Sequence, residues 1–403
     1  MTTEHTNAGV AAQTPLRVAI IGGSLGGLMA ALALRRAGFD VHVYERSRTT
    51  LQDRGAGLRV QQDLRNRLLG VDIDVDASTN TRSSDRFRFV GADNRIVYEE
   101  RTQITYSSWM RLYDMLLGAV ERERYHLDAN VARLEPIDGG TRVHFSDGAP
   151  VDVDLVVAAD GQSSGVREWL VPGSGPRYAG YVCWRGVVQE GELSREAREM
   201  LDGDGLYILP EGSHMSIYPI PQKSGGIAYA IVWYRPVSEP ELPQLLVDKD
   251  GKQRDWSVPA GWLSPRVTEM LHSYARDELP AVAREVVLRT AQPFIQVIVD
   301  VETPRMVRGR VCVIGDAAFS GRPHLGAGTA KAADDAWTLA EALSNIGRGE
   351  VDAALARWEE ARLALGRRYI ALNRELGNAL VAGRVPPERF TSRPSWEMLL
   401  ENR

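Results

Sequence analysis

The sequence contains little cysteine, little lysine and no long hydrophobic stretch. Its two cysteines, Cys183 and Cys312, lie far apart, which excludes CxxC metal sites and a disulfide framework and fits a reducing compartment. The longest apolar runs, such as Val18–Ile21, are far shorter than the roughly 20 residues that cross a bilayer, so no membrane partner is expected. Lysine occurs only at positions 223, 249, 252 and 331, and the net charge is −5. This acidic balance argues against broad nucleic-acid binding, which needs a basic surface.

The beginning of the chain also lacks a targeting pattern. Residues 1–15 have neither a basic segment nor a long apolar segment, so we expect a disordered leader and a cytoplasmic protein. Of the 403 residues, 44% are hydrophobic and 25% are charged, which predicts a globular protein of two or three structural units.

A glycine-rich motif follows the first predicted strand. Arg17–Ile21 reads as a buried strand, Leu28–Gly38 as a helix and Val41–Glu45 as a second strand, which together form a βαβ unit. Between the first strand and the helix, GGSLGG (residues 22–27) matches the dinucleotide fingerprint GxGxxG with Ser24 at the second glycine. Glu45 lies about 20 residues further on, where an acid accepts hydrogen bonds from a ribose diol, so this site favours FAD or NAD over NADP.

Two later segments repeat the pattern of an apolar strand that ends in aspartate and glycine. Leu155–Gly161 runs into Asp160-Gly161, and Val311–Asp316 runs into Gly315-Asp316. Strands that end in this way place functional groups at the carboxyl edge of a parallel sheet, where ligands bind.

In this order and at these separations, the three motifs resemble the fingerprints of FAD-dependent aromatic-ring hydroxylases, the single-component class A flavoprotein monooxygenases. The resemblance runs from about residue 17 to about residue 382. It implies an α/β fold with a Rossmann-like FAD-binding domain of the para-hydroxybenzoate hydroxylase type, an inserted antiparallel β-sheet substrate domain and a C-terminal helical segment. The predicted boundaries are 16–75, 103–175 and 288–348 for the FAD-binding domain, 76–102 and 176–287 for the substrate domain, and 349–403 for the C-terminal helix and tail.

The resemblance implies roles for residues around the adenosine diphosphate half of FAD. Gly22, Ser24 and Leu25 would approach the pyrophosphate. Glu45, with Arg46 beside it, would hold the adenosine ribose.

It also implies roles around adenine and the flavin. Val131 would contact adenine, Arg54 would lie beside the isoalloxazine, and Asp160 would serve both FAD and the transient nicotinamide. Asp316 would bond the ribityl chain. Three further residues would form a helix start aimed at the flavin, where backbone N–H groups stabilise negative charge, namely Gly326, Gly328 and Thr329.

Segments of the second domain are similar to the 2,6-dihydroxypyridine 3-monooxygenase branch. They are YAGYVCWRG (178–186), His214 with YPIP (218–221), and RPH (322–324). Most of the wider family carries an arginine where this chain has Trp109, and Arg111 is nearby. The branch tolerates serine at the second fingerprint glycine.

The activity that this resemblance implies consumes NAD(P)H and O₂ and hydroxylates a small hydroxylated aromatic or N-heteroaromatic ring through a C4a-hydroperoxyflavin. No metal is expected. A base near the ring hydroxyl would make the ring more nucleophilic, and His214 and His324 are the candidates. Tyr218 is a candidate hydrogen-bond partner or ring stacker, as are Tyr207 and Tyr229.

Several alternatives stay open. The same cofactors could serve Baeyer–Villiger insertion, epoxidation or oxidative decarboxylation, or the chain could bind flavin without catalysis. Halogenation is disfavoured, because the Trp-x-Trp signature is absent.

Arg185 could recognise an anionic substrate or pair within the sheet, whereas Trp184 and Trp233 are predicted core residues. An apolar helical stripe between residues 351 and 382 predicts packing, with a contribution to a homodimer as the other reading.

Overall fold

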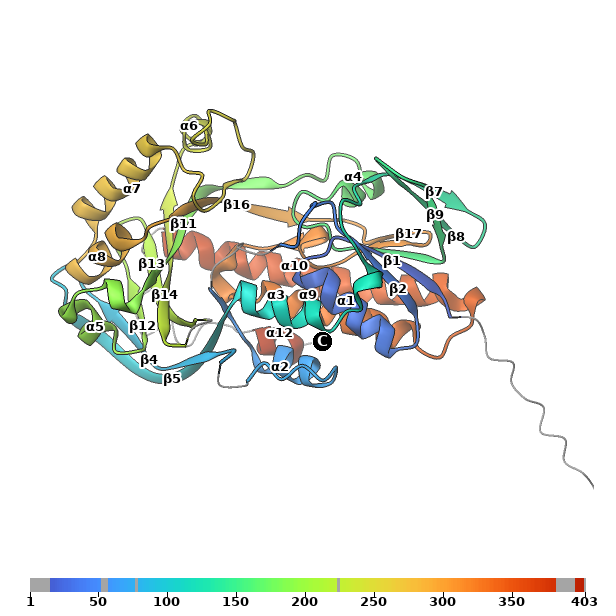
Figure 1. Cartoon of the computed structure of the whole chain (residues 1–403), viewed down its shortest axis with the longest axis horizontal. Helices are drawn as coiled ribbons and strands as arrows, with labels where there is room; N and C mark the ends of the chain where they lie inside the picture. Colours follow the sequence, from blue (N-terminus) through green and yellow to red (C-terminus); the bar gives the residue numbers. More distant parts are fainter. Residues whose placement is uncertain (1–14, 52–56, 77–78, 223–224, 382–395, 402–403) are drawn as a thin grey trace, which may run out of the picture.

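The computed structural model describes residues 15–51, 57–76, 79–222, 225–381 and 396–401. Two sheets lie side by side along the long axis of the molecule, and helix α10 (Val351–Val381) contacts strands of both (Figure 1). The predicted leader and Arg54 lie outside the described residues. The predicted α/β class is confirmed.

The first sheet has six strands in the order β17-β18-β10-β1-β2-β6. All of its neighbouring pairs are parallel except β17 with β18. The central strands are buried on both faces, which explains their continuous apolar sequences. The bounds are β1 Arg17–Ile21, β2 Asp40–Tyr44, β6 Tyr125–His126, β10 Leu155–Ala158, β17 Val307–Arg308 and β18 Val311–Val313.

Helices α1 and α9 pack against each other beside this sheet, through alanine-rich buried faces that allow a close approach. A separate three-stranded antiparallel sheet lies next to β1 and β10 (Figure 1). The bounds are α1 Leu25–Arg36, α2 Gln62–Leu69, α3 Trp109–Gly118, α4 Gly165–Leu170 and α9 Gly328–Leu343, with β7 Val131–Ile137, β8 Gly140–Phe145 and β9 Val151–Val153.

The second sheet has ten strands in the order β15-β16-β11-β14-β13-β12-β4-β5-β3, with β19 paired to β16. The antiparallel strands predicted between residues 178 and 235 are confirmed as β11 to β14. The bounds are β3 Gly57–Arg59, β4 Arg82–Val90, β5 Ile96–Ser108, β11 Arg177–Gln189, β12 Gly205–Ile208, β13 His214–Pro221, β14 Ile227–Pro236, β15 Ser257–Val258, β16 Phe294–Glu302 and β19 Phe319–Ser320.

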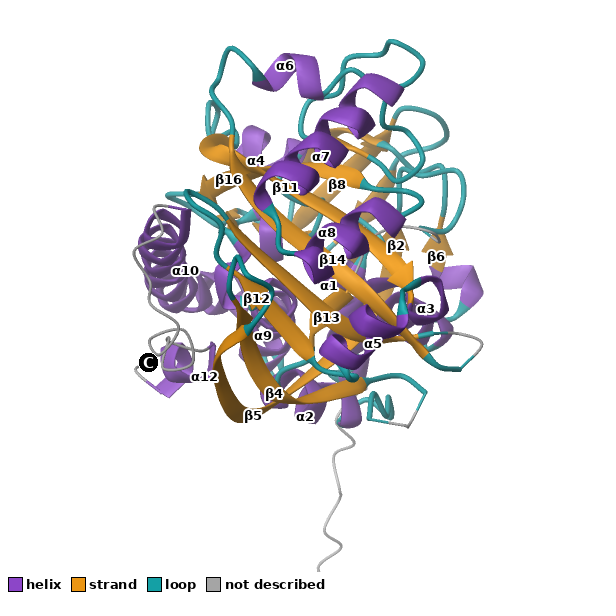
Figure 2. Cartoon of the chain, turned by 90° about the vertical axis from the view of Figure 1, so that its left-hand side faces the viewer, coloured by secondary structure: helices purple, strands orange, loops and turns teal. Residues whose placement is uncertain are grey.

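Helices cover one face of the ten-stranded sheet (Figure 2). They are α5 (Arg195–Leu201), α7 (Pro265–Glu278) and α8 (Ala281–Arg289), and the short α6 (Leu242–Leu245) lies in the predicted loop region 238–264. Trp184 and Trp233 are fully buried under these helices and pair with each other across β11 and β14, so their prediction as core residues is confirmed.

Four segments of the large sheet come from stretches that the sequence assigned to the FAD-binding domain. They are β3, the last part of β5, β16 and β19. The apolar pattern of a strand reports its burial but not which sheet it joins, which explains the difference. The domain boundaries stay a prediction.

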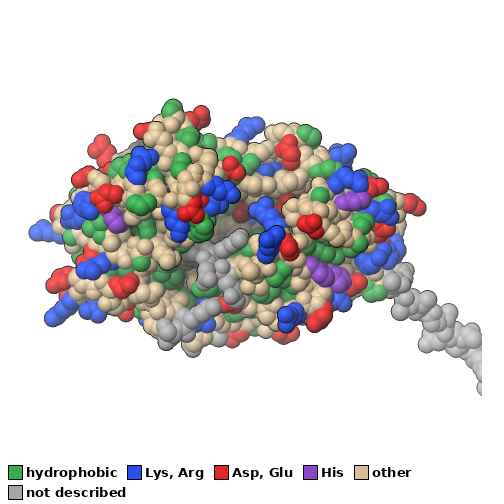
Figure 3. All heavy atoms as spheres, turned by 45° about the horizontal axis from the view of Figure 1, so that its top comes forward, with side chains coloured by type: hydrophobic (Ala, Val, Ile, Leu, Met, Phe, Trp, Pro, Cys, Tyr) green, Lys and Arg blue, Asp and Glu red, His purple; other side chains and the backbone are tan. Residues whose placement is uncertain are grey.

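The predicted apolar stripe lies on α10 and packs within the chain. Leu355, Trp358, Leu365, Tyr369 and Leu380 are buried, and α12 (Trp396–Glu401) packs on the same helix. A homodimer stays a prediction. No helix in the described part of the chain is long and apolar enough to cross a membrane. Acidic and basic side chains are interspersed over the face seen in Figure 3.

Candidate functional site

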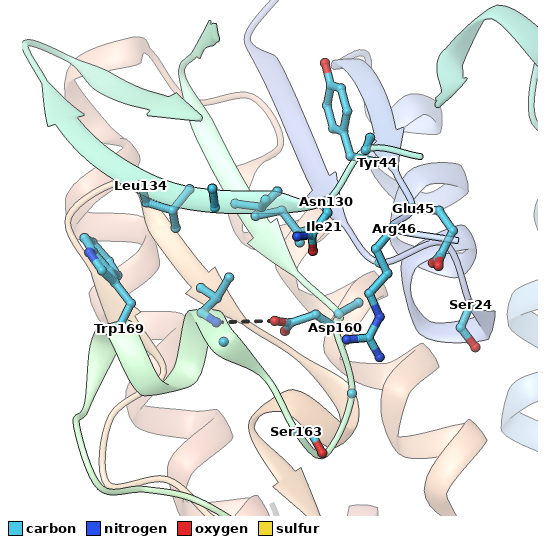
Figure 4. Close-up of a pocket in the computed structure, with 18 of the residues that line it drawn as sticks. Ile21, Ser24, Tyr44, Glu45, Arg46, Asn130, Leu134, Asp160, Ser163 and Trp169 are labelled. Carbon is cyan, nitrogen blue, oxygen red and sulfur yellow. Dashed lines mark hydrogen bonds between the residues drawn. The ribbon is translucent and has the colours of Figure 1, made fainter. Parts of the chain in front are cut away.

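A cavity of about 440 Å³ lies at the carboxyl ends of β1 and β2, beside the start of α1. Figure 4 shows side chains from the glycine-rich turn, the end of β2 and the turn after β10 around this space. Leu25 is buried at the first residue of α1, outside this lining. Six of the residues predicted to bind FAD line the cavity, namely Gly22, Ser24, Glu45, Arg46, Val131 and Asp160.

The glycine-rich turn forms a cradle that side chains would fill. Gly22 has a φ of +101°, and a Cβ there would lie 2.5 Å from the carbonyl oxygen of Ala159. A Cβ at Gly27 would lie 1.8 Å from the carbonyl oxygen of Gly22. Ser24 caps the start of α1 without a side-chain capping bond, and its side chain lines the cavity. The backbone N–H groups at the helix N-terminus can therefore approach a phosphate closely.

Glu45 is held rigidly at the end of β2. Its Oε2 accepts a hydrogen bond from the backbone N–H of Gly23 at 2.8 Å, and its Oε1 accepts one from Ser47 at 2.9 Å. Each carboxylate oxygen keeps a second lone pair that can accept from a ribose hydroxyl. Arg46 projects into the cavity between Ser24 and Asp160 (Figure 4).

Asp160 contributes a buried oxygen that a ligand can satisfy. Its Oδ2 accepts from the backbone N–H of Val166 at 3.3 Å, whereas its Oδ1 has no hydrogen-bond partner among the described residues. Burial raises the pKa of this carboxyl, against a lowering contribution from hydrogen bonds of Ser164 and Val166. An unpartnered polar atom beside a glycine cradle and a helix N-terminus fits a dinucleotide that carries phosphates and hydroxyls.

The third fingerprint lies in the turn between β18 and α9. Asp316 is exposed there and lines neither this cavity nor the second one described below. The preceding glycine, Gly315, donates its N–H to Asp335 Oδ2 at 2.8 Å and accepts at its carbonyl from Lys331 Nζ at 3.1 Å. Lys331 and Asp335 are both buried and pair at 2.7 Å. This ion pair of α9 fixes the turn that carries Asp316.

A second cavity of about 280 Å³ lies between the uncovered face of the ten-stranded sheet and the start of α9. Trp109 lines both cavities and stacks on Tyr113 with 5.0 Å between ring centroids. Arg111 lines neither cavity, and its Nη2 donates to the carbonyl of Gln222. Six predicted site residues line this second cavity, namely His214, Tyr218, His324, Gly326, Gly328 and Thr329.

The two histidines lie next to each other in this cavity. His214 is buried and stacks on Tyr234 at 4.5 Å between ring centroids, and its ring centroid is 5.2 Å from that of His324. His324 Nε2 lies 2.7 Å from the hydroxyl oxygen of Tyr181, with which it shares a hydrogen bond. The structure therefore brings together two groups that can exchange protons with a small ligand.

The tyrosine candidates divide between the two faces of the sheet. Tyr218 lines the cavity, donates its hydroxyl to the carbonyl of Gly57 at 2.8 Å and has a pKa raised by burial. Tyr207 also lines the cavity. Tyr229 lies on the helix-covered face, where its hydroxyl accepts from the backbone N–H of Gly203, so it lines neither cavity.

Both cysteines are buried and free. Cys312 lies in β18, where burial raises the pKa of its thiol. Cys183 in addition lines the second cavity, and burial raises the pKa of its thiol to about 12.

Arg185 of β11 lines the second cavity. The sequence left two roles open for it, namely recognition of an anionic substrate and pairing within the sheet. Its Nη1 lies 3.3 Å from Gln296 Oε1 and its Nη2 lies 3.3 Å from the carbonyl oxygen of Gly57, both long hydrogen bonds. Its Nε has no partner among the described residues. Gln296 and Tyr181 were not singled out from the sequence as site residues. The alternation of residues along a strand indicates which side chains share a face of the sheet. It does not indicate which face stays uncovered, because that depends on where the helices pack.

A dinucleotide-type cavity that shares Trp109 with a smaller, aromatic-walled cavity is the arrangement expected of a flavin-dependent hydroxylase. Family models agree: residues 17–84 match pyridine nucleotide-disulphide oxidoreductase, residues 264–372 match FAD binding domain, and residues 178–300 match FAD binding domain-like.

Curated relatives cover nearly the whole chain. A 2,6-dihydroxypyridine 3-monooxygenase from Paenarthrobacter nicotinovorans is 36% identical, over 91% of this chain and 92% of the relative. A 6-hydroxynicotinate 3-monooxygenase from Bordetella bronchiseptica is 24% identical, over 86% of this chain and 87% of the relative. The solved structure of 2,6-dihydroxypyridine-3-hydroxylase from Arthrobacter nicotinovorans superposes with a TM-score of 0.87 at 35% identity, over 93% of this chain and 94% of that one. The chain belongs to the family of FAD-dependent aromatic hydroxylases and is a monooxygenase that uses FAD, NAD(P)H and O₂.

Proposed function

We propose that this enzyme hydroxylates a small N-heteroaromatic ring that carries ring hydroxyls, of the dihydroxypyridine type. The observation that carries the proposal is the second cavity, whose volume of about 280 Å³ suits a single ring. Aromatic side chains form its walls, and His214 and His324 offer ring nitrogens to a hydroxylated ligand. Two relatives whose names specify hydroxylated pyridines support this substrate class.

The residues of the first cavity fit FAD and are the ones that would hold it. The glycine cradle and the start of α1 would bind the pyrophosphate, and Glu45 would accept from the adenosine ribose. Asp160 and Asp316 would bind polar groups further along the cofactor. Bound FAD, reduced by NAD(P)H, supplies the means of activating O₂.

The protein residues of the second cavity prepare the ring for attack. A histidine that accepts the proton of a ring hydroxyl leaves an ionised, more electron-rich ring. His324 is positioned for this by its hydrogen bond to Tyr181, and His214 by its stacking on Tyr234. The glycine-containing start of α9, at Gly328, would direct backbone N–H groups at the isoalloxazine. The sheet and Trp109 would shield one side of the ring from water.

The test uses the purified, FAD-loaded enzyme with NADH and NADPH in turn. We expect 2,6-dihydroxypyridine to accelerate NAD(P)H oxidation and to gain one oxygen atom that derives from isotopically labelled O₂, as seen by mass spectrometry. The matched control is 2,6-dimethoxypyridine, which has no ring hydroxyl to ionise. Failure of every hydroxylated pyridine, or insertion of the label into a non-aromatic ketone, would contradict the proposal.

A further inference from the structure

The second cavity carries positive charge without acidic side chains to balance it. Among the described residues that line it are two arginines, Arg59 and Arg185, but no aspartate or glutamate. The ionisable side chains recorded as acting on Arg185 are Tyr218, Cys183 and Tyr234, none of which is a carboxylate. Arg185 is half-buried. A partly desolvated cation that lacks a counter-ion costs free energy in the ligand-free protein, so a counter-ion from a ligand is favoured.

The ionisable neighbours of Arg185 do not supply that counter-ion. Cys183, Tyr218 and Tyr234 surround the guanidinium, and burial raises the pKa of each of them, to about 12 for Cys183 and well above its ordinary value for Tyr234. All three groups are therefore neutral near pH 7. The polar groups that reach the guanidinium are uncharged: Gln296 Oε1 and the carbonyl oxygen of Gly57 lie 3.3 Å away, and the hydroxyl of Tyr218 also interacts with it.

The register of the sheet directs Arg185 at the same space as the histidines. Arg185 pairs with Val232, and Val232 pairs with Ser216, so these side chains form one row across β11, β14 and β13. The neighbouring row runs from Cys183 through Tyr234 to His214. Both rows point to the uncovered face, because the intervening residues pack under the helices.

We propose that Arg185 is the receptor for an anionic oxygen of the substrate, either an ionised ring hydroxyl or a ring carboxylate. This inference rests on the proposed function and narrows its substrate class to rings that bind as anions. A guanidinium binds two anionic oxygens, or one through two donors, with fixed geometry. Its position one row from His214 places the anion at one side of the ring and the histidines at another.

The experiment measures dissociation constants of the oxidised holoenzyme by calorimetry, without NAD(P)H. Two matched pairs of probes separate the sources of the anion: 2,6-dihydroxypyridine against 2,6-dimethoxypyridine, and 6-hydroxynicotinate against 6-hydroxynicotinamide. The wild-type enzyme should prefer the anionic member of at least one pair by about 10-fold. Arg185→Met should weaken binding of that anion on the order of 30-fold or more and remove the preference.

Two further variants keep the test sharp. Arg185→Lys retains the charge but loses the planar fork, so it should bind the anion with intermediate affinity. Arg177→Met removes an exposed arginine from the same strand and should bind as the wild type does. The melting temperature of ligand-free Arg185→Met should be equal to or higher than that of the wild type, because a half-buried charge without a counter-ion has been removed.

The outcomes separate this inference from the proposed function. Equal affinity of Arg185→Met, Arg185→Lys and wild type for the anion overturns the inference, as does a wild-type enzyme without preference in either pair. A lower melting temperature of Arg185→Met with unchanged affinity assigns Arg185 to the sheet instead. Hydroxylation of a pyridine that is unaffected by Arg185→Met retains the function and refutes the inference. Anion-selective binding without hydroxylation of any ring retains the inference and refutes the function.

Discussion

Replacement of Asp335 by asparagine tests how the third fingerprint is held. Every described hydrogen bond to this carboxylate is donated by a backbone N–H or a cation: Gly315 N–H at 2.8 Å, Lys331 Nζ at 2.7 Å, Arg362 Nε at 2.8 Å and also Arg362 Nη2. In Asp335→Asn the amide NH₂ must therefore face one of these donors, whichever way it is turned. Two buried cations also lose a shared counter-ion. Removal of one partner from a buried ion pair costs about 3–5 kcal/mol, which is the expected fall in the free energy of unfolding.

The pH dependence of stability gives an independent readout. Burial alone would raise the pKa of Asp335, but Lys331 and Arg362 hold it below its ordinary value of 3.8. The folded pKa is thus lower than the unfolded one. The stabilisation is present above pH 3.8 and is lost as the pH falls from there through the lower pKa of the folded state. Asp335→Asn should show a smaller loss of stability than the wild type in that acidic window.

The assay is denaturant unfolding of the holoenzyme at a series of pH values, with FAD release measured in parallel. Glu199→Gln, which breaks an exposed i,i+4 pair with Arg195, is the control and should cost at most about 0.5 kcal/mol. Adding Lys331→Met to Asp335→Asn should recover part of the loss, since one orphaned cation is removed. A loss of less than about 1 kcal/mol, with an unchanged acid profile, would refute the structural role of this ion pair.

Two further predictions concern the cavities. Gly27→Ala should destabilise the fold by about 1–3 kcal/mol and reduce FAD content, because its Cβ would overlap the carbonyl oxygen of Gly22. Gly26→Ala is the matched control, since its Cβ would meet Ala332 at an ordinary 3.6 Å, and equal FAD loss in both variants would contradict the argument. His214→Ala and His324→Ala should each lower the hydroxylation rate by about 100-fold or more and shift its pH profile. Unaltered profiles in both variants would remove them as bases.

The lining of the first cavity could be predicted because the residues that form it are local in sequence. Gly22, Ser24 and Glu45 belong to one βαβ unit, whose turn geometry requires glycine and whose second strand ends at an acid. Asp160 follows from the same rule applied to another parallel strand. The Lys331–Asp335 pair was not predicted, because its burial depends on Arg362 from a separate helix.

The substrate half depends on contacts that sequence patterns do not report. Strand alternation alone places Tyr229 on the same face as Trp233, four residues on, and this face was predicted to be core. That signal could have separated Tyr229 from Tyr218. No local pattern shows that β16 joins the large sheet and brings Gln296 to Arg185, because the pairing joins residues more than a hundred positions apart.

Alternation along β11 also places the residues that pack the sheet and the residue that carries charge on opposite faces. Trp184 and Gly186 face the helices, where a Cβ at Gly186 would lie 2.3 Å from Thr290, so these positions are constrained by packing. Cys183 and Arg185 face the cavity. A substitution at position 185 therefore changes the charge that a ligand meets without entering the core between the sheet and its helices. Relatives built on the same strand can differ in the charge of the ring they accept while they keep the same fold, and the residue at position 185 is where such a difference is expected.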